Sequence, residues 1–146
     1  NIGNGDQNGV GTWGDQGKSV AGGNDFIIPD PNLHFQPVYF AFDQSRVGAS
    51  EMSKIDAVAT YLKSHPDCGV IVEGNCDERG SAEYNRALGE RRAIASKEAL
   101  VQRGAPEAHI KTVSYGVEKP ADPGHNEQAW QKNRRDEFIG GKLISK

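Results

Sequence analysis

The stretch EGNCDERGSAEYNRALGERRA, residues 73–93, holds an acid in a turn and an arginine within the predicted helix that follows this turn. Asp77 lies in the turn that opens the stretch, and Arg92 follows fifteen residues later. A carboxylate binds an ammonium group, and a guanidinium binds a carboxylate through two parallel hydrogen bonds. Side chains of these two types on one rim therefore suit a zwitterionic ligand.

The predicted helix adds polar groups between the two charges. Its residues Ser81, Asn85, Leu88 and Arg92 are spaced i, i+4, i+7 and i+11, which at about 100° per residue is one narrow stripe. We expect this stripe to form the wall of a groove beside the core face, with the Asn85 amide between the charges. The alternative is that Asp77 only closes a turn and Arg92 only covers a solvated face.

The elements that must position these residues alternate between strands and helices. The sequence predicts strands at 38–43, 69–75, 109–116 and 134–144, and helices at 50–66, at 81–104 and, as a short turn, at 129–133. This β-α-β-α-β-β order predicts an α/β (α+β) sandwich with the helices packed on one mixed sheet. Within the second helix the expected core stripe is Tyr84, Ala87, Leu88, Ile94, Ala95 and Val101.

The end of the first predicted strand brings a second acid toward the same place. That strand ends at Phe42 and Asp43, and Asp77 follows the end of the next strand. Parallel α/β sheets gather ligand contacts beyond the carboxyl ends of their strands. We therefore expect Asp43 and Asp77 to converge.

Composition divides the chain into a tail and one domain. Residues 1–24 hold eight of the 18 glycines and few aliphatic residues, so we expect 1–36 to be a flexible linker with a proline-punctuated lead-in, and 37–146 to be the folded domain.

The net charge of −3, with both signs interspersed, argues against a nucleic-acid-binding protein. No apolar run approaches the ~20 residues of a membrane span. The absence of an initiator Met leads us to expect a processed N-terminus, with any targeting signal upstream.

Catalytic and metal-binding patterns are absent from the sequence. It has no GxSxG, HExxH or P-loop motif, and the adjacent Asp77 and Glu78 do not make a glycosidase pair. Cys68 and Cys76 would lie ~26 Å apart along a strand, beyond the ~7 Å of a disulfide, and their spacing is unusual for zinc. We expect a non-enzymatic protein that needs no metal or cofactor.

Three motifs in order, DERGSAEYNRALGERRA, VSYGVEKP and KNRRDEF, carry a family resemblance. Over residues 38–139 the chain resembles the OmpA-like domain and, within that family, the peptidoglycan-associated lipoproteins of the Tol–Pal system. The resemblance implies non-covalent binding of peptidoglycan through the diaminopimelate of its stem peptide, a zwitterion. It also implies a place on the periplasmic face of the outer membrane, held by an N-terminal lipid anchor, where the protein tethers that membrane to the cell wall.

The family's binding residues can be carried over one at a time. Its aspartate corresponds to Asp77, its asparagine to Asn85 and its arginine to Arg92. The further lining positions are Phe42, Asp43, Ser81 and Leu88, with Asn133 and Arg134 beside the site in a more structural role. The family usually has His-Thr or His-Ala before the aspartate, where this chain has Asn75 and Cys76, so we expect altered hydrogen bonding in this loop.

The resemblance leaves two other roles open. One is a docking module for the periplasmic propeller protein of the Tol system, and the other is a wall anchor of the motor-stator type. Docking of that partner is compatible with wall binding, whereas the three motifs favour the peptidoglycan-associated lipoproteins over a stator-type relative.

Overall fold

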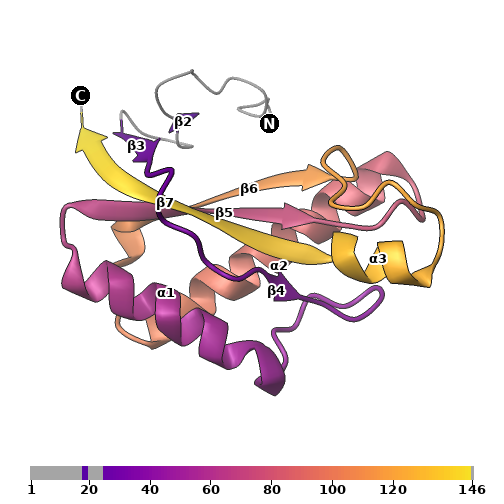
Figure 1. Ribbon diagram of the computed structural model, residues 1–146, viewed down its shortest axis with the longest axis horizontal. Helices are drawn as coiled ribbons and strands as arrows, with labels where there is room; N and C mark the ends of the chain where they lie inside the picture. The colour runs from indigo at the N-terminus through magenta and orange to yellow at the C-terminus, as the bar shows by residue number, and fades with distance from the viewer. Residues whose placement is uncertain (1–17, 20–24, 146) are drawn as a thin grey trace.

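A computed structural model describes residues 18–19 and 25–145 of the chain and shows a mixed sheet with two long helices on one face (Figure 1). The strands are β2 Lys18–Ser19, β3 Asp25–Pro29, β4 Val38–Tyr39, β5 Cys68–Asn75, β6 Ile110–Gly116 and β7 Arg135–Ser145. The helices are α1 Met52–Ser64, α2 Ala82–Gln102 and α3 Glu127–Asn133, with 3-10 turns at Ala49–Glu51 and Glu107–His109. Apart from β2, the linker predicted at 1–24 lies outside the described residues.

The sheet has the strand order β2-β3-β7-β5-β6, and β4 pairs with the first residues of β7. β5 and β6 are parallel and are joined through α2, whereas the pairs made by β7 are antiparallel. The carboxyl ends of β5 and β6 therefore point to the same edge, where α3 and the chain after β4 also lie (Figure 1). The predicted fold class, with helices packed on one mixed sheet, is confirmed.

The lead-in at 25–36 contributes a strand that the sequence pattern does not predict. β3 pairs with the second half of β7 along its whole length, and Ile27 in its centre is fully buried against Ile71. Pro29 and Pro31 explain why the pattern indicates a loop, because a proline has no N–H to donate to a ladder. In the structure Pro29 closes the strand, so most of the ladder is unaffected.

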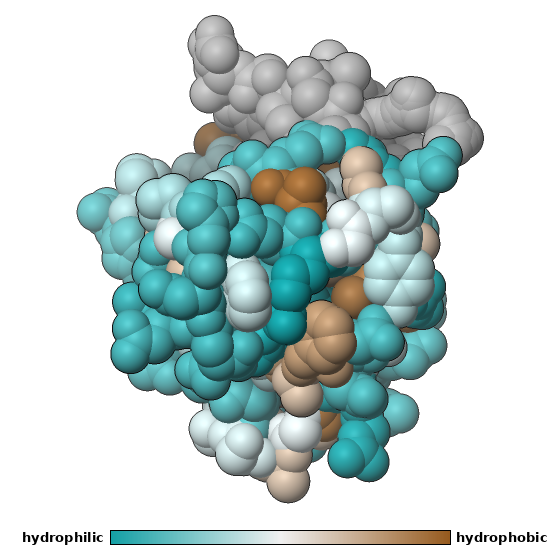
Figure 2. Space-filling model, turned by 90° about the vertical axis from the view of Figure 1, so that its right-hand side faces the viewer, coloured by the Kyte–Doolittle hydropathy of each residue, from teal (hydrophilic) through white to brown (hydrophobic). Residues whose placement is uncertain are grey.

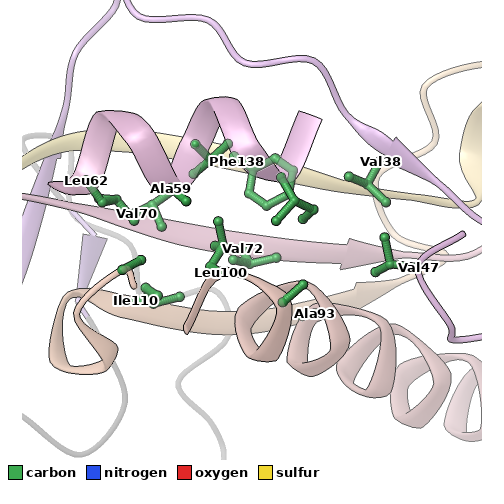
Figure 3. Packing of buried hydrophobic residues seen from close by; sticks show 14 of the residues in the cluster. Val38, Val47, Ala59, Leu62, Val70, Val72, Ala93, Leu100, Ile110 and Phe138 are labelled. Atoms are coloured by element: carbon green, nitrogen blue, oxygen red, sulfur yellow. The ribbon is translucent and has the colours of Figure 1, made fainter. Parts of the chain in front are cut away.

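One apolar layer between the sheet and the two long helices forms the main core. Side chains from α1, α2 and the strands point toward one another there (Figure 3). Its fully buried members include Ile55, Val58, Leu100, Val70, Val72 and Ile110. Burial of each large aliphatic side chain contributes about 1.5–3 kcal/mol relative to exposure, so this layer is the main source of stability.

α2 packs unusually close to β5 through two facing glycines. A Cβ atom on Gly74 would lie 1.8 Å from the carbonyl oxygen of Gly89, which no side chain can occupy. The predicted core stripe of α2 is partly wrong, because Tyr84, Ala87 and Ile94 lie at the surface. The face that is buried carries Asn85, Leu88, Gly89, Arg92, Ala93, Ser96, Ala99 and Leu100.

β4 ends earlier than the strand predicted at 38–43. After Tyr39 the chain leaves the sheet, and a turn forms in which the Gln44 N–H donates to the Ala41 carbonyl at 3.1 Å. The side chain of Arg92 donates to the carbonyls of both these residues, at 2.7 Å and 3.2 Å. These bonds draw the segment over α2, so Phe42 becomes exposed instead of alternating within a strand.

Candidate functional site

A pocket of about 220 Å³ opens beyond the carboxyl end of β5. Its walls are the turn after β5, the first turns of α2 and the chain after β4. The lining residues are Phe42, Asp43, Cys76, Asp77, Arg79, Gly80, Tyr84, Asn85, Leu88 and Arg92. Figure 2 looks onto this side of the molecule, where apolar side chains appear as separate spots among hydrophilic ones.

Six of the eight residues predicted for the site line this pocket, namely Phe42, Asp43, Asp77, Asn85, Leu88 and Arg92. Ser81 does not, because it is the N-cap of α2: its Oγ accepts the Tyr84 N–H at 3.0 Å and its backbone is extended. Its hydroxyl is therefore used to cap the helix and is not part of the pocket lining. Arg134 lies behind the pocket, where it donates to the Phe40 carbonyl at 2.8 Å. The ligand-binding role of the eight stays a prediction.

Asp77 is the acid of the pocket and is only 4% exposed. Its Oδ1 accepts the backbone N–H and the Nε of Arg79, at 3.0 Å and 3.2 Å. Its Oδ2 accepts Arg79 Nη2 at 2.9 Å and Arg134 Nη1 at 3.4 Å. Burial raises the pKa of Asp77, but the hydrogen bonds from Arg79 outweigh it and the pKa is lowered. The carboxyl group is therefore an anion at neutral pH.

Arg92 is the arginine of the pocket and is 1% exposed. Nε donates to the Gln44 carbonyl, Nη2 to Ala41 and Nη1 to Asn75, the last at 3.0 Å. Burial lowers the pKa of this side chain, but arginine keeps its proton in proteins. The guanidinium thus ties the chain after β4 to the end of β5, and it also faces the pocket.

The positions where the chain departs from the usual family residues are both buried. Asn75 Nδ2 donates to the Glu73 carbonyl at 3.1 Å, and the Cys76 thiol donates to the Asn85 carbonyl at 3.1 Å. Burial raises the pKa of Cys76 to about 11, so this thiol is a small, neutral part of the wall. The second cysteine, Cys68, is half-buried at the start of β5, and both are free thiols.

Arg79 belongs to the site but was not among the predicted residues. Its guanidinium lies over two aromatic rings, 4.0 Å from the centroids of both Phe42 and Trp130. Both rings stabilise the cation through their faces. Trp130 comes from α3, far along the chain, so neither a helical period nor a local motif joins it to Arg79.

Tyr84 also lines the pocket. Its hydroxyl donates a hydrogen bond to Asp43 Oδ1, and this bond raises the pKa of Tyr84. Asp43 has a positive φ of 56°, a conformation in which acidic and amide residues are over-represented. The predicted convergence of Asp43 and Asp77 holds in that both line one pocket.

Asn133 holds the loop between β6 and α3. Its Oδ1 accepts the N–H groups of Ala121 and Asp122, at 2.7 Å and 2.9 Å, and its Nδ2 donates to the Asp122 carbonyl. This is a structural role beside the pocket. It also fixes the end of α3, and therefore the position of Trp130.

The arrangement suits recognition of a molecule with two opposite charges. An anionic Asp77 and a cationic Arg92 line one small cavity, and the amide of Asn85 lies in the same wall. Among the described residues there is no group of three or more metal-ligating side chains. Within that same part of the chain, no helix is both long and apolar enough to cross a bilayer.

Comparison with known proteins gives consistent results. A model of the OmpA family matches residues 39–134. The chain is 46% identical over 110 residues to the peptidoglycan-associated lipoprotein of Pasteurella multocida (strain Pm70), which covers 75% of this chain and 73% of that protein.

Solved structures show the same likeness. The crystal structure of the peptidoglycan-associated lipoprotein from Burkholderia pseudomallei matches with a TM-score of 0.70 and 42% identity, over 76% of this chain and 96% of that one. The C-terminal domain of Helicobacter pylori MotB matches with a TM-score of 0.68 but only 22% identity, over 74% of this chain and 85% of that one. The second likeness shows the fold alone.

Proposed function

Because this chain belongs to the OmpA family, we propose that its pocket binds peptidoglycan without a covalent bond, through the diaminopimelate residue of the stem peptide. Relatives that are 46% and 42% identical to it over the matched residues carry the name peptidoglycan-associated lipoprotein. The role is one of binding, and no chemical step is involved.

The single observation that carries the proposal is that Asp77 and Arg92 line the same pocket. The free end of diaminopimelate carries an ammonium and a carboxylate on one carbon. Asp77 accepts the ammonium, and Arg92 donates to the carboxylate. Charge-assisted hydrogen bonds of this kind contribute about 1.5–3 kcal/mol each when partly desolvated.

Two features of the pocket support this assignment of roles. A guanidinium has five N–H groups, and the bonds of Arg92 to three backbone carbonyls leave two for a ligand. Pockets for drug-sized molecules occupy about 300–1,000 Å³. The 220 Å³ here suits one amino-acid head group better than a sugar pair.

In the cell, the proposed place of the protein is the envelope, on the periplasmic face of the outer membrane. There it tethers the membrane to the wall, and an N-terminal lipid is the proposed anchor. A second candidate role is the docking of a protein partner, such as the propeller protein of the Tol system. Arg79 and the exposed aromatic residues Phe42 and Tyr84 favour it, because arginine and aromatic residues are enriched at protein interfaces. The stator-type role has only the likeness in fold to support it.

A pull-down on purified diaminopimelate-type peptidoglycan tests the main proposal. Asp77→Asn keeps the shape of the side chain but removes the charge that holds the ammonium. We expect its apparent affinity to fall about tenfold or more, which corresponds to ~1.4 kcal/mol. The matched control is Asp56→Asn, at an exposed position of α1, which should bind like the wild type. Wild-type retention of a folded Asp77→Asn variant would show that the pocket is not the site.

A further inference from the structure

Every acceptor position of the Asp77 carboxylate is already in use. A carboxylate offers about four lone-pair positions. Three of them accept from the Arg79 backbone N–H, Nε and Nη2, and the fourth accepts from Arg134 Nη1. An ammonium group from a ligand can therefore reach Asp77 only if one of these bonds is broken.

The Arg79 side chain is the partner that can leave. Arg134 is buried and is held in addition by the Phe40 carbonyl. The Arg79 backbone N–H is fixed by the turn, but the Arg79 side chain is 32% exposed. Rotation of this side chain frees up to two acceptor positions and leaves the turn intact.

A displaced Arg79 guanidinium keeps part of its stabilisation. The rings of Phe42 and Trp130 both contact it, and neither contact is made through Asp77. The carboxylates of Glu78 and Glu127 also act on its charge. The cost of displacement is therefore the ion pair to Asp77 and a part of the contact with the two rings.

We propose that Arg79 is a built-in competitor for the ligand's ammonium group and so limits how tightly the pocket binds a free amine. It neutralises Asp77 while the pocket is empty, and the ammonium of a diaminopimelate residue takes its place. This inference rests on the proposed function, because it assumes that Asp77 receives an ammonium.

The test is calorimetric titration of a diaminopimelate-containing muropeptide and of the same molecule with its free amine acetylated. The variant Arg79→Gln removes the competitor, and we expect it to bind the free-amine ligand about three- to fivefold more tightly, the factor that a partly exposed ion pair contributes. The acetylated ligand cannot use Asp77, so it should gain nothing. Arg86→Gln, at an exposed arginine paired with Glu118, is the matched control and should leave both affinities unchanged.

Two spectroscopic measurements separate competition from a merely structural role. The carboxyl carbon resonance of Asp77 should titrate at a higher pH in Arg79→Gln, because hydrogen bonds from Arg79 lower the pKa of this acid. With Trp13 replaced by Phe, ligand binding should change the fluorescence of Trp130 in the wild type, since the guanidinium beside the ring moves. In Arg79→Gln this change should be lost.

The outcomes separate the two proposals. If the wild type binds the muropeptide and Arg79→Gln binds it equally or more weakly, the competitor role is wrong and the proposed function stands. If the wild type does not bind the muropeptide, the proposed function fails and this inference fails with it.

Discussion

The two ends of β5 are built from opposite chemistry, although one sheet and one helix span both. Around the first half of the strand the buried residues are aliphatic: Ile55, Leu62, Val70, Leu100 and Ile110. Around its last residues they are polar or charged: Asn75, Asp77, Arg92, Arg134 and Asp136. The same α2 helix carries Leu100 toward one end and Arg92 toward the other.

The difference shows which end of β5 stabilises the fold by burial alone and which end depends on paired charges. At the aliphatic end, burial is favourable in itself. At the polar end each charged group must keep its partner, because loss of one partner leaves the other buried and unpaired. A ligand that supplies matching charges can be accommodated only at the polar end. We therefore expect substitutions in the pocket to change both the ligand affinity and the free energy of unfolding.

The largest expected effect comes from Arg92→Ala compared with Leu100→Ala. Loss of the Arg92 guanidinium leaves the carbonyls of Ala41, Gln44 and Asn75 without their donors, and we expect a cost of about 3–5 kcal/mol. Leu100→Ala creates a cavity in the aliphatic layer and should cost about 2–5 kcal/mol. Urea unfolding of both variants gives the two values.

Binding distinguishes these two variants. Leu100→Ala should bind the muropeptide like the wild type under conditions where it is folded, whereas Arg92→Ala should not bind measurably. Arg92→Lys is a useful intermediate, because it retains the charge but not the planar fork of donors. If Leu100→Ala lost affinity as Arg92→Ala does, the division between the two ends would be wrong.

A second prediction concerns the pH dependence of the polar end. Asp136 on β7 is fully buried, its Oδ2 accepts the Ser96 hydroxyl at 2.6 Å, and Oδ1 has no partner among the residues the structure describes. Burial raises the pKa of Asp136 to about 8, above the ~3.9 of an unfolded chain. Between these values the folded state holds a proton that the unfolded state releases. Stability is therefore lost as the pH rises through this window.

Asp136→Asn removes this dependence, because an amide stays neutral. Its stability relative to the wild type should rise between pH 5 and pH 8, by about 3–4 kcal/mol. Asp77 has the opposite effect on the pH dependence of stability. Its pKa is lowered, so its contribution to the free energy of unfolding is present at neutral pH and lost in acid. Urea unfolding between pH 5 and pH 8 gives the slope that Asp136 causes, the same measurement below about pH 4 gives the slope that Asp77 causes, and Asp56→Asn is the surface control. A parallel pH dependence of wild type and Asp136→Asn would rule out a titrating Asp136.

The fold could be predicted from the sequence wherever periodicity and hydrophobicity agree. The run at 69–75 and the helices that flank it are of this kind, and both appear in the structure. β3 could not be predicted, because its prolines indicate a loop while its pairing with β7 is a long-range event. The early end of β4 could not be predicted either, because it also depends on a long-range contact. The buried Arg92 of α2 binds the carbonyls of residues 41 and 44 and draws this segment out of the sheet.

The candidate site could be predicted to the extent that it follows one helix. Asn85, Leu88 and Arg92 share a helical stripe, and that stripe lines the pocket. The prediction places this stripe beside the core face of the helix, whereas in the structure it is part of the buried face. Its polar side chains can be buried there because they donate to backbone carbonyls. The position of Arg79 depends on Trp130, fifty-one residues later in the sequence, so no local pattern contains it.

The central claim is that Asp77 and Arg92 together bind the ammonium and the carboxylate of one amino-acid head group. Calorimetry on two muropeptides that share the same sugars, one with diaminopimelate and one with lysine at the third position, tests it most directly. Lysine offers the ammonium but no carboxylate beside it, so the Arg92 guanidinium loses its partner, and a site built for a polar group rejects the analogue that lacks it. We predict that the wild type binds the diaminopimelate form at least about tenfold more tightly. Equal affinity for the two forms would contradict the claim, whatever the family of the chain.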